Sequence, residues 1–293
     1  MFNLTHLIRR VLPVLTLSFS AAAGAQTPPL SIKVYNADAN SFHVNAVVVS
    51  GKTEALVIDT GFTRADALRV AAQVLDSGKA LKTILVSNAD PDFYFGAEVL
   101  KAQFPQAQVV ATAAVREKIQ AKLAGKVAFW GPKMGANAPR TPLLPELLSG
   151  DRLSVDGEVV EVRGSTGELA HRPYVWMPSI RTVAGALAVF GNLHVWTADT
   201  QKPSEKQAWL AQLDEIEALG PTTVVPGHMA AGSPLDRSAI AYTRAYLRRF
   251  EAESAQAAHA GGLIQAMKAA YPDAGLGLAL DIGAKVAKGE MKW

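Results

Sequence analysis

A buried strand followed at once by a short acidic turn constrains this chain most. Residues 84–86 are Ile-Leu-Val and predict the strand. Residues 87–96 follow it with the order Ser-Asn-Ala-Asp-Pro-Asp-Phe-Tyr-Phe-Gly. Asp90 before Pro91 is a favourable N-cap with proline at the first helical position. The sequence therefore predicts a strand, a polar turn and a helix that begins at Pro91.

Strands and helices alternate along most of the chain. Runs rich in β-branched residues predict strands, and Thr63 with Asp66 three residues later predicts a helix start with a capping box. We expect strands at residues 31–34, 44–49, 55–58, 83–86, 109–111, 153–155, 158–162, 174–177, 186–190 and 222–225. We expect helices at residues 63–75, 91–104, 113–123, 204–219 with Ser204 as its cap, 233–258 and 263–271. This alternation favours a layered α/β protein.

Residues 126–150 contain Gly, Pro and scattered aromatic side chains and show little periodicity. We therefore expect a loop or lid there, in which Trp130 would line a pocket for a ring-containing ligand. No repeat and no linker divides the chain. Residues 26–293 are expected to form one domain with a helical extension from about residue 251.

The N-terminal segment, residues 1–25, has the pattern of a signal peptide. Arg9 and Arg10 precede an apolar run at residues 11–19, and small residues up to Ala25 form a cleavage site. The apolar run is too short to span a bilayer, and so is every later one. We expect a soluble protein, periplasmic or secreted after cleavage near Ala25, with no stable membrane anchor.

The composition of the mature chain excludes several functions. Without residues 1–25 it keeps 27 basic and 26 acidic residues and no basic block, so no nucleic-acid partner is expected. It has no cysteines, which excludes disulfides, thiolate zinc sites and a cysteine nucleophile. Its histidines lie at positions 43, 171, 194, 228 and 259.

The acidic turn resembles the metal-binding loop of the metallo-β-lactamase superfamily, whose pattern is Thr-His-x-His-x-Asp-His-x-x-Gly. The matching positions here are Asn88 and Asp90 at the first two histidines, Asp92 at the aspartate, Phe93 at the third histidine and Gly96 at the glycine. The loop therefore keeps the spacing, the aspartate and the glycine of the family pattern, but most of its metal-ligand positions carry other residues.

The order of the other motifs extends the resemblance to roughly residues 30–250. Asp59-Thr60-Gly61 precedes the acidic turn, and Pro226-Gly227-His228 lies near the end. The resemblance implies an αββα sandwich, in which two mixed sheets are flanked by helices. It also implies that Asp59 braces the metal loop by hydrogen bonds, with a second-shell influence on the site.

Family members bind one or two metal ions, usually zinc, which polarise the substrate and supply a hydroxide. Of the remaining ligand positions, only His228 is retained. Ser165 replaces the middle histidine, and Ala186 or Asn192 stands where the family has its bridging aspartate. A dinuclear zinc site is therefore not expected.

Three hypotheses account for the altered loop. In the first it is structural: Asp90 caps the helix, Asp92 suits the helix dipole, and Phe93 fills the space that a ligand and metal would occupy. In the second, one divalent cation such as Mg²⁺, Mn²⁺ or Ca²⁺ is held by Asn88, Asp90, Asp92 and His228. In the third, Asp92 and His228 form a metal-free catalytic pair with Ser165 or Thr166 as nucleophile.

His194 leaves two interpretations open. It follows the strand at residues 186–190, close to where some branches of the superfamily have a histidine near the site. A histidine among apolar residues is more often a hydrogen-bonded core group. The alternative is a pocket residue that contacts substrate, together with Ser165, Thr166 and Trp130.

The sequence leaves two classes of function. The resemblance implies a weak or single-metal hydrolase of an ester, lactone, lactam or phosphoester, with Asp92 and His228 as its catalytic residues. The alternative is a catalytically inactive periplasmic protein that binds a small molecule or another protein with the same fold. Zinc-dependent β-lactamase activity is not expected, and the oligomeric state is not defined.

Overall fold

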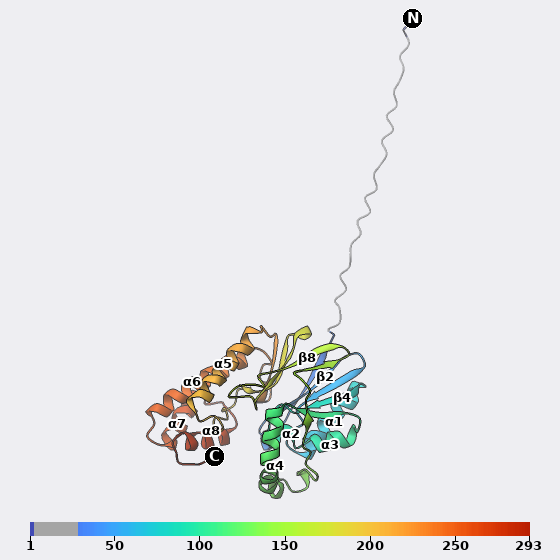
Figure 1. Cartoon of the computed structure of the whole chain (residues 1–293). Coiled ribbons are helices and arrows are strands. Elements are labelled where there is room, and N and C mark those ends of the chain that lie inside the picture. The colour runs from blue at the N-terminus through green and yellow to red at the C-terminus, as the bar shows by residue number, and fades with distance from the viewer. Residues whose placement is uncertain (3–28) are drawn as a thin grey trace.

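The computed structural model describes residues 1–2 and 29–293, so nearly all of the predicted signal peptide lies outside the described residues. Two mixed β-sheets lie face to face between two layers of helices (Figure 1). This arrangement confirms the αββα sandwich expected from the sequence. Among the described residues, no helix is long and apolar enough to cross a membrane.

The first sheet has six strands in the order β1-β2-β3-β4-β5-β6. Strands β1 to β3 pair antiparallel, and β3 to β6 pair parallel. The strands are β1 Ser31–Asn36, β2 Asn45–Ser50, β3 Glu54–Ile58, β4 Ala80–Leu85, β5 Gln108–Ala111 and β6 Glu146–Leu147. The two-residue strand β6 lies in the stretch for which the sequence predicted no regular structure.

The second sheet has five strands in the order β11-β10-β9-β8-β7. Only β10 and β11 pair parallel; the other neighbours are antiparallel. The strands are β7 Arg152–Val155, β8 Glu158–Arg163, β9 Tyr174–Met177, β10 Thr182–Gly191 and β11 Thr223–Met229. The parallel pair brings His228 at the end of β11 beside Phe190 of β10.

Alternating side chains separate the core into layers. In β3, Leu56 and Ile58 join the cluster that both sheets share, whereas Ala55 and Val57 join the cluster under helix α1. This is the period-two pattern of a strand that is buried on both faces. A third apolar cluster packs the second sheet against the C-terminal helices.

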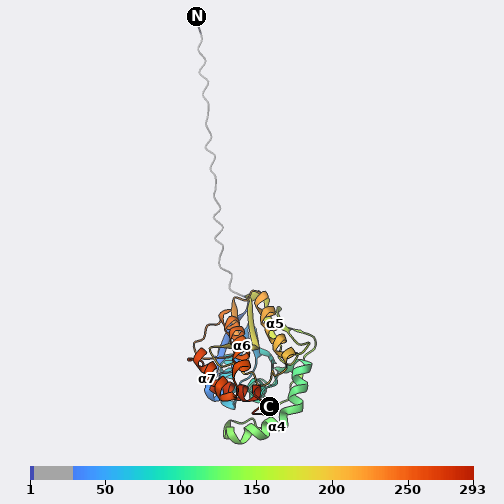
Figure 2. The ribbon, with the colours of Figure 1, turned by 90° about the vertical axis from the view of Figure 1, so that its left-hand side faces the viewer.

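The helices cover the outer faces of the two sheets. Figure 2 views the molecule from the side of α5, α6 and α7, which cover the second sheet, with α4 at the lower edge. The helices are α1 Arg64–Ser77, α2 Pro91–Tyr94, α3 Ala97–Gln103, α4 Ala113–Met134, α5 Pro203–Ala218, α6 Ser238–Gln256, α7 Ala260–Ala270 and α8 Gly277–Ala287. The capping box predicted at Thr63 and Asp66 is present at the start of α1.

The prediction of a loop over residues 126–150 was wrong for its first third. Helix α4 continues to Met134, with Pro132 inside its last turn. Val127, Trp130 and Met134 recur at helical spacing and pack against the cluster under the first sheet. Tertiary packing of this apolar stripe therefore outweighs the Gly and Pro residues that suggested a loop.

Three smaller predictions were also wrong. The helix expected over residues 91–104 is divided into α2 and α3 at Gly96. Helix α5 has Lys202 as its N-cap and Pro203 at its first position, so Ser204 is not the cap. Helix α6 begins at Ser238 rather than at residue 233, after the Pro-containing stretch 233–237. The tail after Tyr271 also contains α8, which the sequence pattern did not reveal.

Candidate functional site: an altered metal loop and an adjacent charged cluster

Asp59 fixes the start of the loop that follows β4. Strands β3 and β4 are parallel neighbours, so Asp59 after β3 lies beside Ser87 after β4. Its carboxylate accepts a hydrogen bond from the Ser87 backbone N–H at 2.8 Å and from the Ser87 hydroxyl at 2.7 Å. Burial raises the pKa of Asp59 to about 7, although these bonds favour the ionised form. Asp59 thus holds the start of this loop through two hydrogen bonds from Ser87.

Asn88 uses both ends of its side-chain amide to hold the loop. The side chain is buried, and its Oδ1 accepts a hydrogen bond from the Asp90 N–H at 2.8 Å. Its Nδ2 donates to the His171 carbonyl at 3.3 Å. The oxygen that would serve a cation is therefore directed into its own turn.

Asp90 occupies the N-cap of α2, but its side chain makes no capping hydrogen bond. Asp90 thus stands at the predicted N-cap with Pro91 at the first helical position, but its side chain does not contribute a capping bond. One carboxylate oxygen lies 3.9 Å from Nζ of Lys126, which the extended helix α4 supplies. Burial and the charge of Asp199 raise the pKa of Asp90. Asp90 therefore lies among the charges of Asp199, Lys126, Arg172 and Lys118.

Asp92 and His228 do meet. His228 Nε2 lies 3.4 Å from Asp92 Oδ2, and both side chains are nearly inaccessible to solvent. His228 Nδ1 donates to the Phe42 carbonyl at 2.9 Å, because a carbonyl oxygen can only accept, so Nε2 carries the lone pair of the neutral ring. Burial lowers the pKa of His228 to about 4 and raises that of Asp92 well above its usual range. Because the His228 ring is therefore neutral near pH 7, the contact is not an ion pair.

Aromatic rings enclose this pair. The Phe190 ring stacks on His228 with centroids 5.2 Å apart, and the Phe93 ring meets it edge-on at 5.4 Å. Phe93 is fully buried. The space around the imidazole is thus packed with hydrocarbon, as in the first of the three hypotheses.

The donors of this loop do not fit the metal centre of the family. Asn88 Oδ1 is engaged in its own turn, Asp90 faces Lys126, and Phe93 supplies a ring where the family has an imidazole. Within residues 29–293, no group of three His, Cys, Asp or Glu side chains is arranged to hold a metal ion. Asp92 and His228 are in contact, but Asp90 does not join them in such a group: its carboxylate lies beside Lys126, although its charge still raises the pKa of Asp92.

Ser165, Thr166 and Trp130 were expected, with His194, to line a pocket. Ser165 is half-buried and Thr166 is exposed in the connection between β8 and β9. Trp130 packs edge-on against Phe42 and Phe62 with centroids 5.5 and 5.2 Å apart. For the part of the chain that the structure describes, none of them hydrogen-bonds to Asp92 or His228. Trp130 contacts the site only through Phe42, whose carbonyl holds His228.

His194 lies in the core between the second sheet and the C-terminal helices. Its Nδ1 lies 3.0 Å from the hydroxyl of Tyr246 on α6, and its side chain is buried. Burial, with Lys268 nearby, lowers the pKa of His194. Of the two interpretations, these contacts favour the hydrogen-bonded core group.

A charged cluster that the sequence analysis did not identify lies beside Asp90. We use this name for Asp90, Lys118, Lys126, His171, Arg172 and Asp199. The pKa values of Asp90, Lys118, His171 and Arg172 are each shifted by the charges of other members. The connection before β9 supplies His171 and Arg172, α4 supplies the two lysines, and the loop after β10 supplies Asp199. A sequence signal existed: His171-Arg172 stands directly before the buried strand β9.

Arg172 is the most buried cation of this charged cluster, with 3% of its surface exposed. Its Nη1 donates to Thr200 Oγ1 at 2.8 Å, and its guanidinium lies 5.3 Å from the centroid of the Trp209 ring. Burial lowers its pKa. Among the described residues, the bond to Thr200 is the one hydrogen bond of the guanidinium, which has five donors.

Asp199 and His171 complete the charged cluster. Burial would raise the pKa of Asp199, but Arg172 and hydrogen bonds from the indoles of Trp196 and Trp293 outweigh it and lower the pKa. The indole bonds measure 2.8 and 2.7 Å. His171 Nε2 is buried and has no hydrogen-bond partner within residues 29–293. Burial, with Lys118 and Arg172 nearby, lowers the pKa of His171 to about 4, so its ring is neutral.

Comparison with known families identifies the class of protein. The sequence matches the Metallo-beta-lactamase superfamily over residues 39–228, and the chain belongs to that superfamily. Its altered ligand positions make it a divergent member. The fold is therefore that of a hydrolase superfamily. Comparison with curated proteins gave no match.

Solved structures with the same fold are distant in sequence. A metallo-beta-lactamase family protein from Thermus thermophilus is 18% identical, with a TM-score of 0.63 over 89% of this chain and 92% of that one. A beta-lactamase domain protein from Burkholderia ambifaria is 18% identical, with a TM-score of 0.61 over 89% and 86%. A metallo-beta-lactamase from Pontibacter korlensis is 19% identical, with a TM-score of 0.54 over 77% and 97%. At this identity the likeness concerns the fold alone.

Proposed function

We propose that this chain is an exported binding protein of the metallo-β-lactamase fold, with a degenerate zinc centre, that holds a small monoanion at the charged cluster. The observation that carries the proposal is the pairing of two changes. The metal loop is packed around the contact of Asp92 with the neutral ring of His228, and a buried arginine with unused donors lies beside it. The hydrolytic alternative lacks the donor set that a catalytic metal ion requires.

Charge supports an anionic ligand. With the neighbouring Lys122 and Glu205, whose charges also act on its members, the cluster has four cations (Lys118, Lys122, Lys126 and Arg172) and three carboxylates (Asp90, Asp199 and Glu205), an excess of one positive charge. Burial lowers the pKa of Lys118 and of Arg172, because each charge loses hydration in the folded chain. A bound monoanion would balance the excess and replace the lost hydration.

Hydrogen bonding supports a carboxylate-like geometry. The guanidinium fork of arginine matches the two oxygens of a carboxylate. The neutral ring of His171 contributes a further buried nitrogen without a partner among the described residues. The proposed ligand is thus a small molecule with one carboxylate. The signal-peptide pattern of residues 1–25 supports export, to the periplasm or outside the cell.

The proposal is tested on the mature chain, residues 26–293, by thermal shift and calorimetry. The probes are benzoate and acetate as monoanions, succinate as a dianion, and MgCl₂, MnCl₂ and ZnCl₂ as cations. We expect saturable stabilisation by a monocarboxylate and none by the cations. We also expect no turnover of a chromogenic β-lactam.

Substitution of the central cation should remove this binding. Arg172→Met is expected to weaken the dissociation constant of the monocarboxylate by roughly 10- to 100-fold, since hydrogen bonds to charged groups contribute about 1.5–3 kcal/mol. Lys118→Met is the second variant, should the first fail to fold by circular dichroism. Arg249→Met is the matched control, because Arg249 is exposed on α6 and pairs with Glu253.

Three results would contradict the proposal. One is tight binding of a divalent cation that Asp92→Ala abolishes. Another is hydrolysis that depends on that cation. The third is stabilisation by carboxylates that is equal in Arg172→Met, Lys118→Met and Arg249→Met, since the anions would then act on the surface in general.

A further inference from the structure

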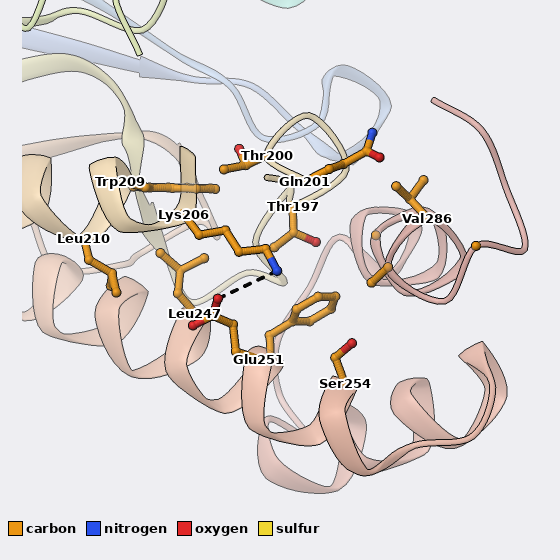
Figure 3. A pocket seen from close by; sticks show the side chains of 14 residues that line it. Thr197, Thr200, Gln201, Lys206, Trp209, Leu210, Leu247, Glu251, Ser254 and Val286 are labelled. Atoms are coloured by element: carbon orange, nitrogen blue, oxygen red, sulfur yellow. Dashed lines mark ion pairs between the residues drawn. The ribbon is translucent and has the colours of Figure 1, made fainter. Parts of the chain in front are cut away.

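A cavity of about 340 Å³ lies within the C-terminal helical layer, apart from the metal loop (Figure 3). Helices α5, α6 and α8 form its sides, and the loop that contains Thr200 and Gln201 borders it. We call it the helical-layer cavity. Its volume falls within the range of roughly 300–1,000 Å³ that is typical of small-molecule sites. It shares no residue with the charged cluster, although Arg172 of that cluster contacts Thr200 and Trp209 on its wall.

One part of the cavity wall is apolar. Trp209 of α5 and Phe250 of α6 are buried, and Leu247 and Val286 also line the cavity. The Trp209 indole N–H donates to the Ala188 carbonyl at 2.8 Å, so its ring is held in one orientation. This part of the wall is suited to the hydrocarbon portion of a ligand.

The other part of the wall is polar and carries charges of both signs. Lys206 of α5 and Glu251 of α6 line the cavity from neighbouring helices, together with Thr200, Gln201 and Ser254. Figure 3 shows the side chains of Lys206 and Glu251 extending toward each other. A purely apolar ligand would leave these groups without partners in place of water. The wall therefore favours a ligand that has both apolar and charged parts.

The two charges are close together but are not hydrogen-bonded to each other. Lys206 Nζ lies 3.7 Å from Glu251 Oε1, the contact that is dashed in Figure 3, and a hydrogen bond requires about 2.7–3.2 Å. Within residues 29–293, neither the ammonium of Lys206 nor the carboxylate of Glu251 makes a hydrogen bond. The ammonium thus keeps its donors and the carboxylate keeps its acceptors. Because both side chains are partly exposed, the pair contributes little free energy and can open for a ligand at little cost.

We infer that the helical-layer cavity binds a small apolar α-amino acid in its zwitterionic form. The carboxylate of the ligand would bond to Lys206, its ammonium would bond to Glu251, and its side chain would pack on Trp209 and Phe250. A ligand with one charge would serve only one of the two charged groups and would separate the other from its partner. An uncharged ligand would serve neither group. The zwitterion is the class that replaces both halves of the ion pair.

Calorimetric titration of the mature chain with L-leucine and three analogues tests the inference. The analogue 4-methylpentanoate lacks the ammonium, 3-methylbutylamine lacks the carboxylate, and glycine lacks the apolar side chain. We expect saturable binding of L-leucine, and each analogue should bind at least about 3-fold more weakly because each loses one set of contacts. Binding of an analogue as tight as that of L-leucine would contradict the contact that the analogue lacks.

Substitution of each charge should act on the matching half of the ligand. Glu251→Gln and Lys206→Met should each weaken L-leucine binding about 3- to 10-fold. Glu251→Gln should not weaken binding of 4-methylpentanoate, which has no ammonium, and Lys206→Met should not weaken binding of 3-methylbutylamine, which has no carboxylate. Glu253→Gln is the matched control, because Glu253 lies on the same helix, pairs with Arg249 and does not line the cavity.

A second pair of variants locates the site. Ala287→Phe places a ring at the cavity from an exposed position on α8 and should abolish binding of L-leucine. Ala270→Phe at the exposed end of α7 is the matched control and should bind as the unaltered chain does. The inference fails if the unaltered chain does not bind L-leucine, or if Glu251→Gln binds it as tightly as Glu253→Gln. It also fails if Ala287→Phe binds it as tightly as Ala270→Phe, since L-leucine would then bind outside this cavity.

Discussion

Asp66→Ala is expected to destabilise the folded chain by roughly 3–5 kcal/mol, because the carboxylate of Asp66 collects buried hydrogen bonds from three segments. It accepts from the Tyr35 hydroxyl at 2.6 Å and from the Ser41 hydroxyl at 2.6 Å. It also accepts from the Thr63 N–H at 2.9 Å and from the Thr63 hydroxyl at 2.7 Å. Alanine would leave these donors unsatisfied under helix α1. Urea unfolding at pH 7 measures the difference.

The pH dependence of this difference has a defined sign. Burial alone would raise the pKa of Asp66, but the hydrogen bonds from Ser41, Tyr35 and Thr63 outweigh it and lower the pKa. A carboxyl whose pKa is lower in the folded state stabilises that state above the unfolded pKa of about 3.9 and loses this contribution as the pH falls further. The gap between the unaltered chain and Asp66→Ala should therefore narrow as the pH drops from 5 towards 3.

Asp76→Ala serves as the control for Asp66→Ala. Asp76 lies at the other end of α1, is exposed and is 3.6 Å from Lys33, so its removal should change stability by less than about 1 kcal/mol. Equal unfolding free energies for the two alanine variants would contradict the role assigned to Asp66. If the difference in unfolding free energy between the unaltered chain and Asp66→Ala instead grew as the pH fell, the assigned sign of the pKa shift would be contradicted, but the role of Asp66 in stability would not.

The Asp66 network illustrates what the sequence could predict. The capping box of Thr63 and Asp66 is local, and spacing alone revealed it. Tyr35 and Ser41 donate from residues far away in the chain, and no periodicity indicates such contacts. The strands are likewise predictable, because they follow local patterns of β-branched residues. The length of α4 is not, because it depends on packing against the first sheet.

The candidate site shows the same difference between features that the sequence predicts and features that depend on long-range contacts. The loop at residues 88–96 and the contact of Asp92 with His228 follow from the family resemblance. The direction in which Asp90 points depends on Lys126, which comes from a helix turn that the sequence suggested was a loop. The charged cluster joins α4 with the segments around His171 and Asp199, so only the folded chain brings its members together.

Gly96→Ala is the second large effect that we expect, with a loss of about 3 kcal/mol in unfolding free energy, the upper end for overpacking a core. Gly96 separates α2 from α3 and is buried against the Asp59-Thr60-Gly61 turn. A Cβ at Gly96 would collide with the Thr60 carbonyl oxygen and would lie 2.8 Å from the Ala67 Cβ. The first of these obstacles is backbone, which cannot rotate away as a side chain can.

The two turns involved are also hydrogen-bonded to each other. The Gly96 N–H donates to the Gly61 carbonyl at 3.1 Å, and the Thr60 N–H donates to the Phe93 carbonyl at 2.9 Å. The Thr60 hydroxyl donates to the same Phe93 carbonyl at 3.0 Å. An alanine at position 96 would force these turns apart and would disturb Asp59 and the loop that it braces. The expected fall in Tm is about 6–12 °C by differential scanning calorimetry.

Gly125→Ala separates this close approach from the general effect of replacing a glycine. Gly125 is exposed within α4, and a Cβ there would have no neighbour within 4 Å. Because alanine favours a helix by about 0.5–1 kcal/mol over glycine, this variant should be slightly more stable than the unaltered chain. The two substitutions should thus act in opposite directions. If Gly96→Ala raised the Tm as Gly125→Ala does, a Cβ at position 96 would fit beside Thr60. The glycine shared with the family motif would then not be required for close packing.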